Sequence, residues 1–192
     1  VQPLTVIGAC EEDKSGTTVT FKPDADIFDT DIYDYETLKV RTRELAFLNK
    51  GLRLTLTDQR SGVEKQETFH YEGGISEYVK FLNKNKTPIH EEIIHLQGEE
   101  AGIMFEVAMQ YNSGYTDNIY SFVNNINTHD GGTHEEGVRR ALTRIINNYA
   151  KKNNFLKDKD AALTGDDVKE GLTMIISCKH PNPQFEGQTK GR

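Results

Sequence analysis

The chain holds 192 residues with a formal net charge of -7 at pH 7, and 28% of its residues are charged. This length suits one substantial core or two small ones, because domains commonly contain about 100 to 150 residues. The acidic balance excludes a protein that coats nucleic acid with its whole surface, so any nucleic-acid contact must be a local basic patch. Two distant cysteines, Cys10 and Cys178, form no disulfide framework and indicate a reducing cytoplasm. No apolar run approaches the roughly 18 residues of a membrane span, so we expect a cytoplasmic protein without a membrane partner.

The first fifty residues predict two strands and a helix. Residues 4–8 and 16–23 have the pattern of strands, and in the second of them Thr17, Val19 and Phe21 share one face. A helix follows within residues 34–51, with Asp34 as a plausible N-cap and a stop at Gly51. The residues that recur at helical spacing along it are Leu38, Thr42, Leu45 and Leu48.

Residues 52–128 predict mostly strands. A hairpin is expected where alternating leucines in 52–60 are followed by 64–71, with the turn across Ser61 and Gly62. A short helix within 73–88, ended by Pro88, is interpreted as a connector. Two more strands are expected around Gly98 to Gly102, and a further single strand over 118–128.

The remaining third predicts a long helix and a buried strand. Thr133 to Glu136 has the form of a capping box, and an apolar stripe follows it at helical spacing. The stripe consists of Val138, Leu142, Ile145, Ile146 and Tyr149. After a charged loop, residues 171–181 are apolar at consecutive positions, as in a strand covered on both faces. The outline is an α+β fold of two units, 1–72 and 73–192.

Two histidines in "HEEIIH", His90 and His95, suggest a zinc site at first sight. They stand five residues apart, where the zinc motif needs four, and strand-like sequence would place them on opposite sides of a sheet. We therefore interpret them as surface or edge histidines and expect no bound metal.

Two glycine-rich stretches remain as candidates for a binding site. One is "HDGGTHEEG" before the long helix, and the other is "QFEGQTKGR", where Lys190 lies between flexible glycines. No P-loop motif and no G-x-S-x-G motif occurs. The residues alone leave open whether the last stretch is a solvated tail or a loop that holds an anion. They also leave Arg139, Arg140 and Arg144 on the long helix as an ordinary solvated face.

Several long stretches resemble the B subunits of bacterial DNA gyrase. They are "GTTVTF", "RELAFLNKGLRLTLTD", "YEGGISEYV", "SFVNNINTHDGGTHEEGVRRALTRIINNYA", "LTGDDVKEGL" and "PNPQFEGQTK". The resemblance covers nearly the whole chain and extends to the B subunits of topoisomerase IV, which remain the alternative. It implies a chain cut from a longer protein, containing the end of a GHKL-type ATPase α/β sandwich. A transducer domain follows, with a fold similar to one in a ribosomal protein and with a β-α-β crossover of unusual hand.

The resemblance also implies roles for individual residues. Thr17 would lie in the hydrogen-bond network under the adenine of ATP, while Gln188 and Lys190 of the "QTK" loop would touch the γ-phosphate. Lys190 would thereby act in catalysis, and Arg139 would line the cavity through which a DNA duplex passes. In such families the rest of the ATP site, including the catalytic glutamate and the magnesium-binding asparagine, lies upstream, so we expect this chain alone to be inactive.

The implied cofactors and partners belong to the full-length protein. They are ATP and Mg²⁺, a gyrase A subunit in an A2B2 heterotetramer, a second B subunit and the DNA duplex. The implied activity is ATP-driven strand passage and negative supercoiling by a type IIA topoisomerase. A different class of function also stays open, namely a non-catalytic interaction module that keeps only the transducer-like fold.

Overall fold

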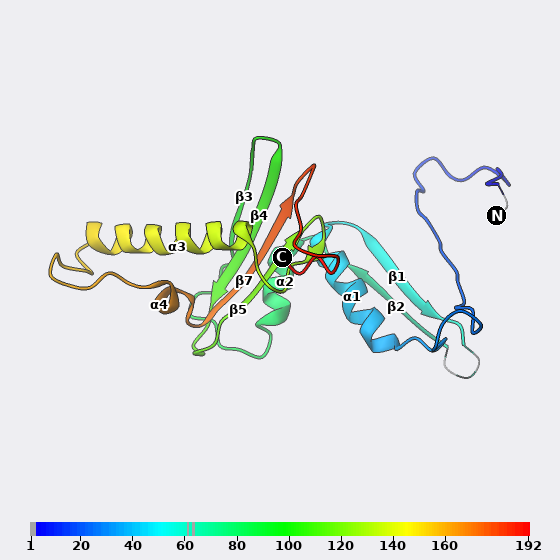
Figure 1. The fold of residues 1–192 in the computed structure, drawn as a ribbon, viewed down its shortest axis with the longest axis horizontal. Coiled ribbons are helices and arrows are strands. Elements are labelled where there is room, and N and C mark those ends of the chain that lie inside the picture. Colours follow the sequence, from blue (N-terminus) through cyan, green and yellow to red (C-terminus); the bar gives the residue numbers. More distant parts are fainter. Residues whose placement is uncertain (1–2, 61, 63) are drawn as a thin grey trace. The chain divides into compact units, whose positions relative to one another are not determined.

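The computed structural model of the chain describes residues 3–60, 62 and 64–192. The chain divides into two compact units, Val1–Asp34 and Tyr35–Arg192 (Figure 1). The boundary expected at residues 72 and 73 concerns the division into family domains and stays a prediction. No helix in the described ranges has both the length and the apolar character needed to cross a membrane.

The first unit contains turns and extended chain, so the two strands predicted over 4–8 and 16–23 are wrong for this chain. Within its described residues 3–34 no helix or strand is formed. Hydrogen bonds within it join near neighbours, such as Asp24 and Asp26, and the rings of Phe21 and Tyr33 form an edge-to-face pair with centroids 5.5 Å apart. Alternating β-branched residues make a stable strand only beside a partner strand, and no partner pairs with these segments in the described chain.

The second unit begins with a helix and a hairpin, as predicted. Helix α1 (Tyr35–Leu48) precedes strands β1 (Arg53–Asp58) and β2 (Lys65–His70), which pair antiparallel with Thr55 opposite Thr68. Ser61, expected in the turn, lies outside the described residues. The guanidinium of Arg43 lies 5.2 Å from the ring of Phe69 and 5.1 Å from that of Phe81, so it joins the hairpin to the next helix.

A five-stranded sheet forms the body of the second unit, in the order β3-β4-β7-β5-β6. Its strands are β3 (Ile94–Glu100), β4 (Ile103–Tyr111), β5 (Asn118–Val123), β6 (Ile126–Asn127) and β7 (Leu172–Lys179). Only β5 and β7 pair in parallel, and the chain between them passes through helices α3 (Thr133–Lys152) and α4 (Gly165–Lys169). This connection is a β-α-β crossover (Figure 1).

Strand β7 is the central strand, and it is buried at every position except its last, Lys179. Ile175 faces a core that includes Phe47 of α1 and Val79 of α2 (Ile75–Leu82). Ile176 faces the opposite core, against which Val138 and Leu142 of α3 pack. Consecutive apolar residues are needed because each face of this strand has its own helical cover.

Several local predictions are corrected by the structure. Residues 118–128 form the β5–β6 hairpin, because Asn124 (φ 50) and Asn125 (φ 65) adopt the left-handed conformation that two-residue hairpin turns require. Helix α2 ends at Leu82, well before Pro88, and it is part of the core and not a connector. The β3–β4 turn lies at Ala101 and Gly102, so Gly98 belongs to a strand.

The capping box predicted at Thr133 is also wrong. Gly132 is the N-cap residue of α3, and no side chain caps this helix. A capping box does occur at α4, where Thr164 and Asp167 bond each other's backbone N–H groups. The stripe on α3 is covered only in part, since Ile145 and Tyr149 remain exposed.

Candidate functional site

The C-terminal segment folds back onto the glycine-rich turn that precedes α3. The backbone N–H of Asp130 donates to the carbonyl of Gly191 at 2.8 Å, and the N–H of Glu186 donates to the carbonyl of Arg192 at 2.7 Å. The guanidinium of Arg192 lies 3.4 Å from the carboxylate of Glu136 on the first turn of α3. Gly191 itself is buried. The segment is therefore an anchored loop and not a solvated tail.

Gln188 and Lys190 lie at the exposed tip of this loop. The tip is a tight turn in which Gly187 (φ 74) and Lys190 (φ 56) adopt the left-handed conformation. The ammonium of Lys190 lies 5.5 Å from the ring centre of Phe185, and no carboxylate in the described part of the chain pairs with it. The loop thus presents a cation and an amide to solvent from a fixed base.

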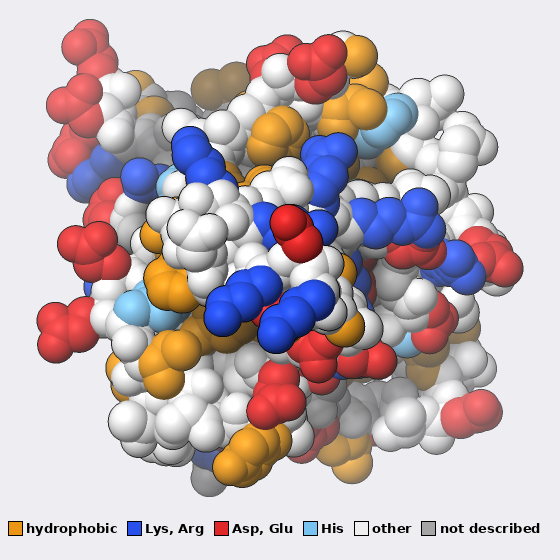
Figure 2. Space-filling model, turned by 90° about the vertical axis from the view of Figure 1, so that its left-hand side faces the viewer, with side chains coloured by type: hydrophobic (Ala, Val, Ile, Leu, Met, Phe, Trp, Pro, Cys, Tyr) orange, Lys and Arg blue, Asp and Glu red, His pale blue; other side chains and the backbone are white. Residues whose placement is uncertain are grey.

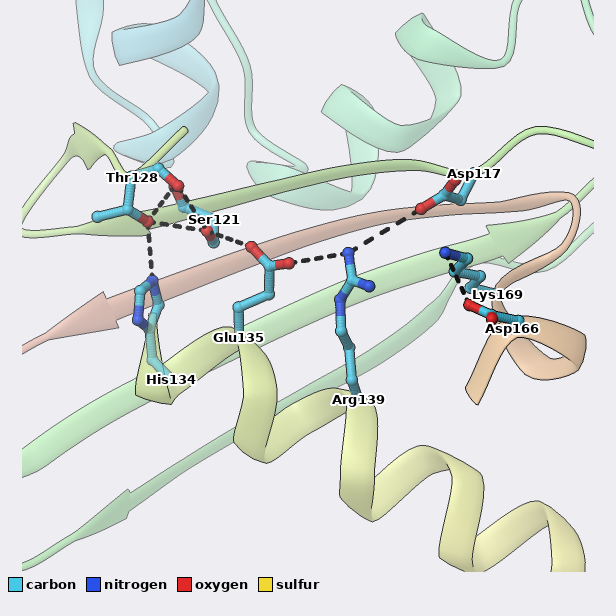
Figure 3. A network of polar contacts seen from close by, with 8 residues as sticks. All are labelled: Asp117, Ser121, Thr128, His134, Glu135, Arg139, Asp166 and Lys169. Atoms are coloured by element: carbon cyan, nitrogen blue, oxygen red, sulfur yellow. Dashed lines mark hydrogen bonds and ion pairs between the residues drawn. The ribbon is translucent and has the colours of Figure 1, made fainter. Parts of the chain in front are cut away.

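A chain of polar contacts runs from the same turn along the first turns of α3 (Figure 3). The hydroxyl of Thr128 donates to the carbonyl of Ser121 at 2.9 Å. The hydroxyl of Ser121 donates to the carboxylate of Glu135 at 2.7 Å. The other carboxylate oxygen of Glu135 accepts from Arg139 at 2.9 Å. His134 Nε2 joins the chain at 2.9 Å from the Thr128 hydroxyl. Because Ser121 and Thr128 are each only 2% exposed, these bonds are shielded from water.

Arg139 is therefore a paired side chain and not part of a plain solvated face. Besides Glu135, it lies 4.0 Å from the carboxylate of Asp117, and its side chain is 38% exposed. Its Nε atom is buried and has no hydrogen-bond partner. The neighbouring Arg140 is 81% exposed, and its ion-pair partner among the described residues is Glu136, at 3.3 Å. The two arginines thus have different electrostatic surroundings on one helix.

The face seen in Figure 2 carries Lys and Arg side chains across its middle, with Asp and Glu side chains around them. Exposed basic residues of α3 and the loop after it are Arg140, Arg144, Lys151, Lys152, Lys157 and Lys159. A local basic area thus exists on a chain whose net charge is -7. The acidic composition left only a local basic patch as a possible contact with nucleic acid, and this area is such a patch.

The structure brings some of the predicted site residues together and leaves others apart. Gln188 and Lys190 share one loop, and that loop contacts the turn from which α3 and Arg139 extend. Thr17 is exposed and belongs to the other compact unit, so its relation to the loop stays a prediction. No group of three or more His, Cys, Asp and Glu side chains that could hold a metal ion occurs among the residues with described positions.

Two open pockets flank the glycine-rich turn. One, of about 400 Å³, is lined by Ser121, Glu135 and Arg139 together with the turn. The other, of about 470 Å³, lies between the first residues of α3 and the segment that leads into the C-terminal loop, and Cys178 lines it. Burial raises the pKa of the Cys178 thiol, so the neutral, unreactive form is favoured.

Sequence reasoning missed Glu135, Ser121 and Thr128 as parts of the site. Glu135 and Arg139 stand four residues apart on a helix, which is a readable signal for an ion pair. Nothing in the sequence points to Ser121, because its contact with Glu135 depends on how β5 packs against α3.

His134 gives the site a testable pH dependence. Burial lowers the pKa of its imidazole, and Glu135 opposes this only in part. Between the folded-state pKa and the ordinary value of about 6.5, the unfolded chain therefore binds more protons than the folded one. The contribution of His134 to the free energy of unfolding is fully present above about pH 6.5, and it is lost as the pH falls through the folded-state pKa.

The expected result is a denaturant midpoint that falls as pH is lowered from about 7 to about 5.5, with a weaker dependence in His134→Gln. Urea unfolding across this range measures it. His129→Gln, which changes a histidine whose side chain is 63% exposed and whose ion pair with Asp130 spans 3.4 Å, should alter the dependence less than His134→Gln does. Equal pH profiles for the parent chain and His134→Gln would contradict the assignment.

Comparison with known proteins agrees with this architecture. A family model described as DNA gyrase B matches residues 74–192. The B subunit of DNA gyrase from Bacillus mycoides is 60% identical over 188 residues, which make up 97% of this chain and 46% of the relative. That of Halalkalibacterium halodurans is 58% identical over 188 residues, 97% of this chain and 29% of the relative. The chain thus spans less than half the length of these curated relatives.

Solved structures give the same picture. The 43K ATPase domain of Thermus thermophilus gyrase B, in complex with an aminocoumarin, matches with a TM-score of 0.75 and 36% identity, over 89% of this chain and 48% of that one. The ATP-binding domain of Francisella tularensis topoisomerase IV matches with a TM-score of 0.70 and 25% identity, over 88% of this chain and 44% of that one. The mixed α+β fold, the match to the family model and the relatives at 56% to 60% identity all agree. The chain belongs to the DNA gyrase B family.

Proposed function

We propose that the chain is the part of a gyrase B protein that passes the state of bound nucleotide to the DNA-facing surface. The full protein would be a type IIA topoisomerase that couples ATP hydrolysis to strand passage and negative supercoiling. The observation that supports this most is the anchoring of the Gln188–Lys190 loop on the turn before α3, through Asp130 and Gly191. If a ligand displaced the tip of this loop, the turn before α3 and the first residues of α3 would move with it.

The loop residues fit a contact with the γ-phosphate of ATP. Lys190 offers an ammonium without a competing carboxylate in the described chain, and Gln188 offers an amide at the same exposed tip. A fixed cation stabilises the charge that redistributes over a phosphoryl group in the transition state. ATP with Mg²⁺ would supply the free energy of hydrolysis, and Thr17 would bond in the network under its adenine. These few residues do not make a nucleotide site, so the 192-residue chain alone should neither bind nor hydrolyse ATP.

The route from nucleotide to DNA would follow contacts within the second unit. Gly191 and Arg192 are tied to Asp130 and Glu136, and the preceding residue in the helix, Glu135, is bonded to Arg139. Arg139 stands about one turn further along α3, so a shift of the first turn of this helix would carry Arg139 with it. Arg139 would contact a phosphate of the passing duplex without reading its sequence, which suits a substrate of any sequence.

The proposed partners are those of the family. They are a gyrase A subunit in an A2B2 heterotetramer, a second B subunit, and a DNA duplex in the cavity lined by the transducer, all in the cytoplasm. The B subunit of topoisomerase IV is the less supported assignment, because among the solved structures the Thermus thermophilus gyrase B domain is 36% identical and the Francisella tularensis topoisomerase IV domain 25%. The curated relatives named above are also gyrase B subunits, at up to 60% identity.

Replacing Arg139 by glutamine in the full-length protein tests the DNA contact. We expect DNA-stimulated ATPase to fall about tenfold, the size of one lost charge-assisted hydrogen bond to phosphate. The free energy of unfolding should fall by only about 1 kcal/mol, since a partly exposed ion pair contributes little.

The measurement is steady-state ATPase with and without linear DNA, beside urea unfolding. Arg53→Gln makes the same charge change on strand β1 and should leave the DNA stimulation as it is in the parent. Unchanged stimulation in Arg139→Gln with a large loss of stability would make Arg139 a structural residue only.

A further inference from the structure

We infer that Glu135 is a positioning residue that holds Arg139 in a paired state and so limits its affinity for a DNA phosphate. This inference rests on the proposed function of Arg139 as a phosphate contact. It concerns regulation of that contact, in which phosphate must compete with a built-in carboxylate.

The position of Glu135 is fixed from three directions. It lies in the first turn of α3, where the helix dipole favours a negative charge. Ser121 donates its hydroxyl to one carboxylate oxygen at 2.7 Å, and Arg139 donates to the other at 2.9 Å. The side chain of Glu135 is only 15% exposed, so water competes weakly for these bonds. The carboxylate therefore stays in place whether or not DNA is present.

Arg139 has few donors left for an incoming phosphate. Its Nη2 group points at Glu135, with Asp117 4.0 Å away on the other side, as Figure 3 shows. Its Nε atom is buried and cannot be reached from solvent. A phosphate is therefore left with the Nη1 group, for which the described residues supply no ion pair, and the nearby carboxylates of Glu135 and Asp117 would still repel it there, since like charges repel.

A weakened contact suits a duplex that has to leave after it has entered. Arg140 and Arg144 on the same helix are exposed, and the Glu136 carboxylate that pairs with Arg140 is itself 47% exposed, so water screens this ion pair and it would restrain a DNA contact little. Arg139 differs because the carboxylate of its partner Glu135 is only 15% exposed. Ser121 belongs to the restraint, since its hydroxyl keeps Glu135 turned toward Arg139.

The test measures binding of a linear duplex of mixed sequence to the full-length protein with a non-hydrolysable ATP analogue, by fluorescence anisotropy at low salt. Glu135→Gln should raise the affinity about three- to tenfold, because the ion pair and the repulsion are both removed. Asp166→Asn removes one negative charge nearby, from a carboxylate that pairs with Lys169 at 2.9 Å, and should change affinity less than about twofold. Ser121→Ala should act in the same direction as Glu135→Gln, with a smaller gain.

Combination with Arg139→Gln separates this inference from the proposed function. In the double variant the gain from Glu135→Gln should vanish, because there is no guanidinium left to release. If Arg139→Gln weakens binding while Glu135→Gln has no more effect than Asp166→Asn, the restraint is refuted and the DNA contact stands. If Arg139→Gln leaves binding unchanged, the DNA contact fails and the restraint fails with it. A loss of affinity in Glu135→Gln would also refute the restraint, and thermal melts of each variant show whether unfolding causes it.

Discussion

Replacing Lys190 by alanine in the full-length protein should lower the rate of ATP hydrolysis about 10²- to 10³-fold, the range expected when one preorganised electrostatic partner is lost. Its ammonium is exposed and lies 5.5 Å from the ring of Phe185. Loss of an exposed contact of this kind costs about 0.5 to 1 kcal/mol. The left-handed backbone at residue 190 (φ 56) strains alanine as it strains lysine, so it adds no further cost. The free energy of unfolding should therefore change little, while the rate of ATP hydrolysis falls strongly.

Steady-state ATPase and thermal melts with and without nucleotide measure both effects. ADP affinity should stay close to that of the parent, because ADP has no γ-phosphate for the lysine to meet. Thr189→Ala, at an exposed neighbour in the same turn, is a matched control and should retain most of the activity. Unchanged turnover in Lys190→Ala would mean that the loop has no part in hydrolysis, and an equal loss of ADP binding would mean general support of the site.

The largest effect on stability is expected at Phe47 on α1. Its side chain is 1% exposed, and its ring stacks on Tyr71 and Tyr78 with centroids 3.7 Å and 4.6 Å apart. Phe47→Ala would leave a cavity in the core that α1 and α2 share with the five-stranded sheet, and buried Phe-to-Ala changes cost about 3 to 5 kcal/mol. Urea unfolding of the 192-residue chain measures the loss.

Phe155→Ala is the comparison for this prediction. Phe155 is 73% exposed, and its ring partner in the described part of the chain is the exposed Tyr149, with centroids 6.3 Å apart. Its removal should cost about 1 kcal/mol or less. Similar losses for the two variants would show that the aromatic cluster around Phe47 does not carry the core.

Much of the fold could be predicted from the sequence where the pattern is local. The helical spacing of Leu38, Leu45 and Leu48 predicted α1, and the unbroken apolar run in 171–181 predicted the central strand β7. The structure confirms both, because amphipathic periodicity and two-sided burial leave direct marks on residue order. The hairpin of β1 and β2 was predictable for the same reason.

The failures occur where structure depends on a partner or on backbone torsion. The strands expected in residues 4–23 need neighbours that the described chain does not supply. The two-residue turn at Asn124 and Asn125 divides a segment that was predicted as one strand. The pattern of apolar residues does not reveal this turn, because the turn depends on backbone torsion angles. Gly132 takes the N-cap position of α3, so the expected capping box at Thr133 has no place to form.

The site divides in the same way. Lys190, Gln188, Thr17 and Arg139 were identified through a resemblance to a family, since a lysine between glycines carries no function by itself. The ion pair of Glu135 and Arg139 could be inferred from their spacing of four residues. The hydrogen bond from Ser121 to Glu135 could not, because it depends on how β5 packs against α3. The docking of Gly191 on Asp130 joins residues that are far apart in the sequence, and only the folded chain reveals it.

The coupling of the C-terminal loop to α3 is most directly tested by Gly191→Val in the full-length protein. A Cβ atom on Gly191 would lie 2.5 Å from the carboxylate of Asp130 and 2.8 Å from the ring of His129, two exposed side chains, so valine forces either these side chains or the loop to move. Faster hydrogen exchange at the Asp130 amide, which the Gly191 carbonyl otherwise protects, shows that the loop has left the turn. The measurement is the ratio of ATPase rates with and without linear DNA. If the anchored loop carries nucleotide state to α3, the ratio should fall to about one, while urea unfolding shows a folded protein. A ratio equal to that of the parent, with the loop displaced, would contradict the account.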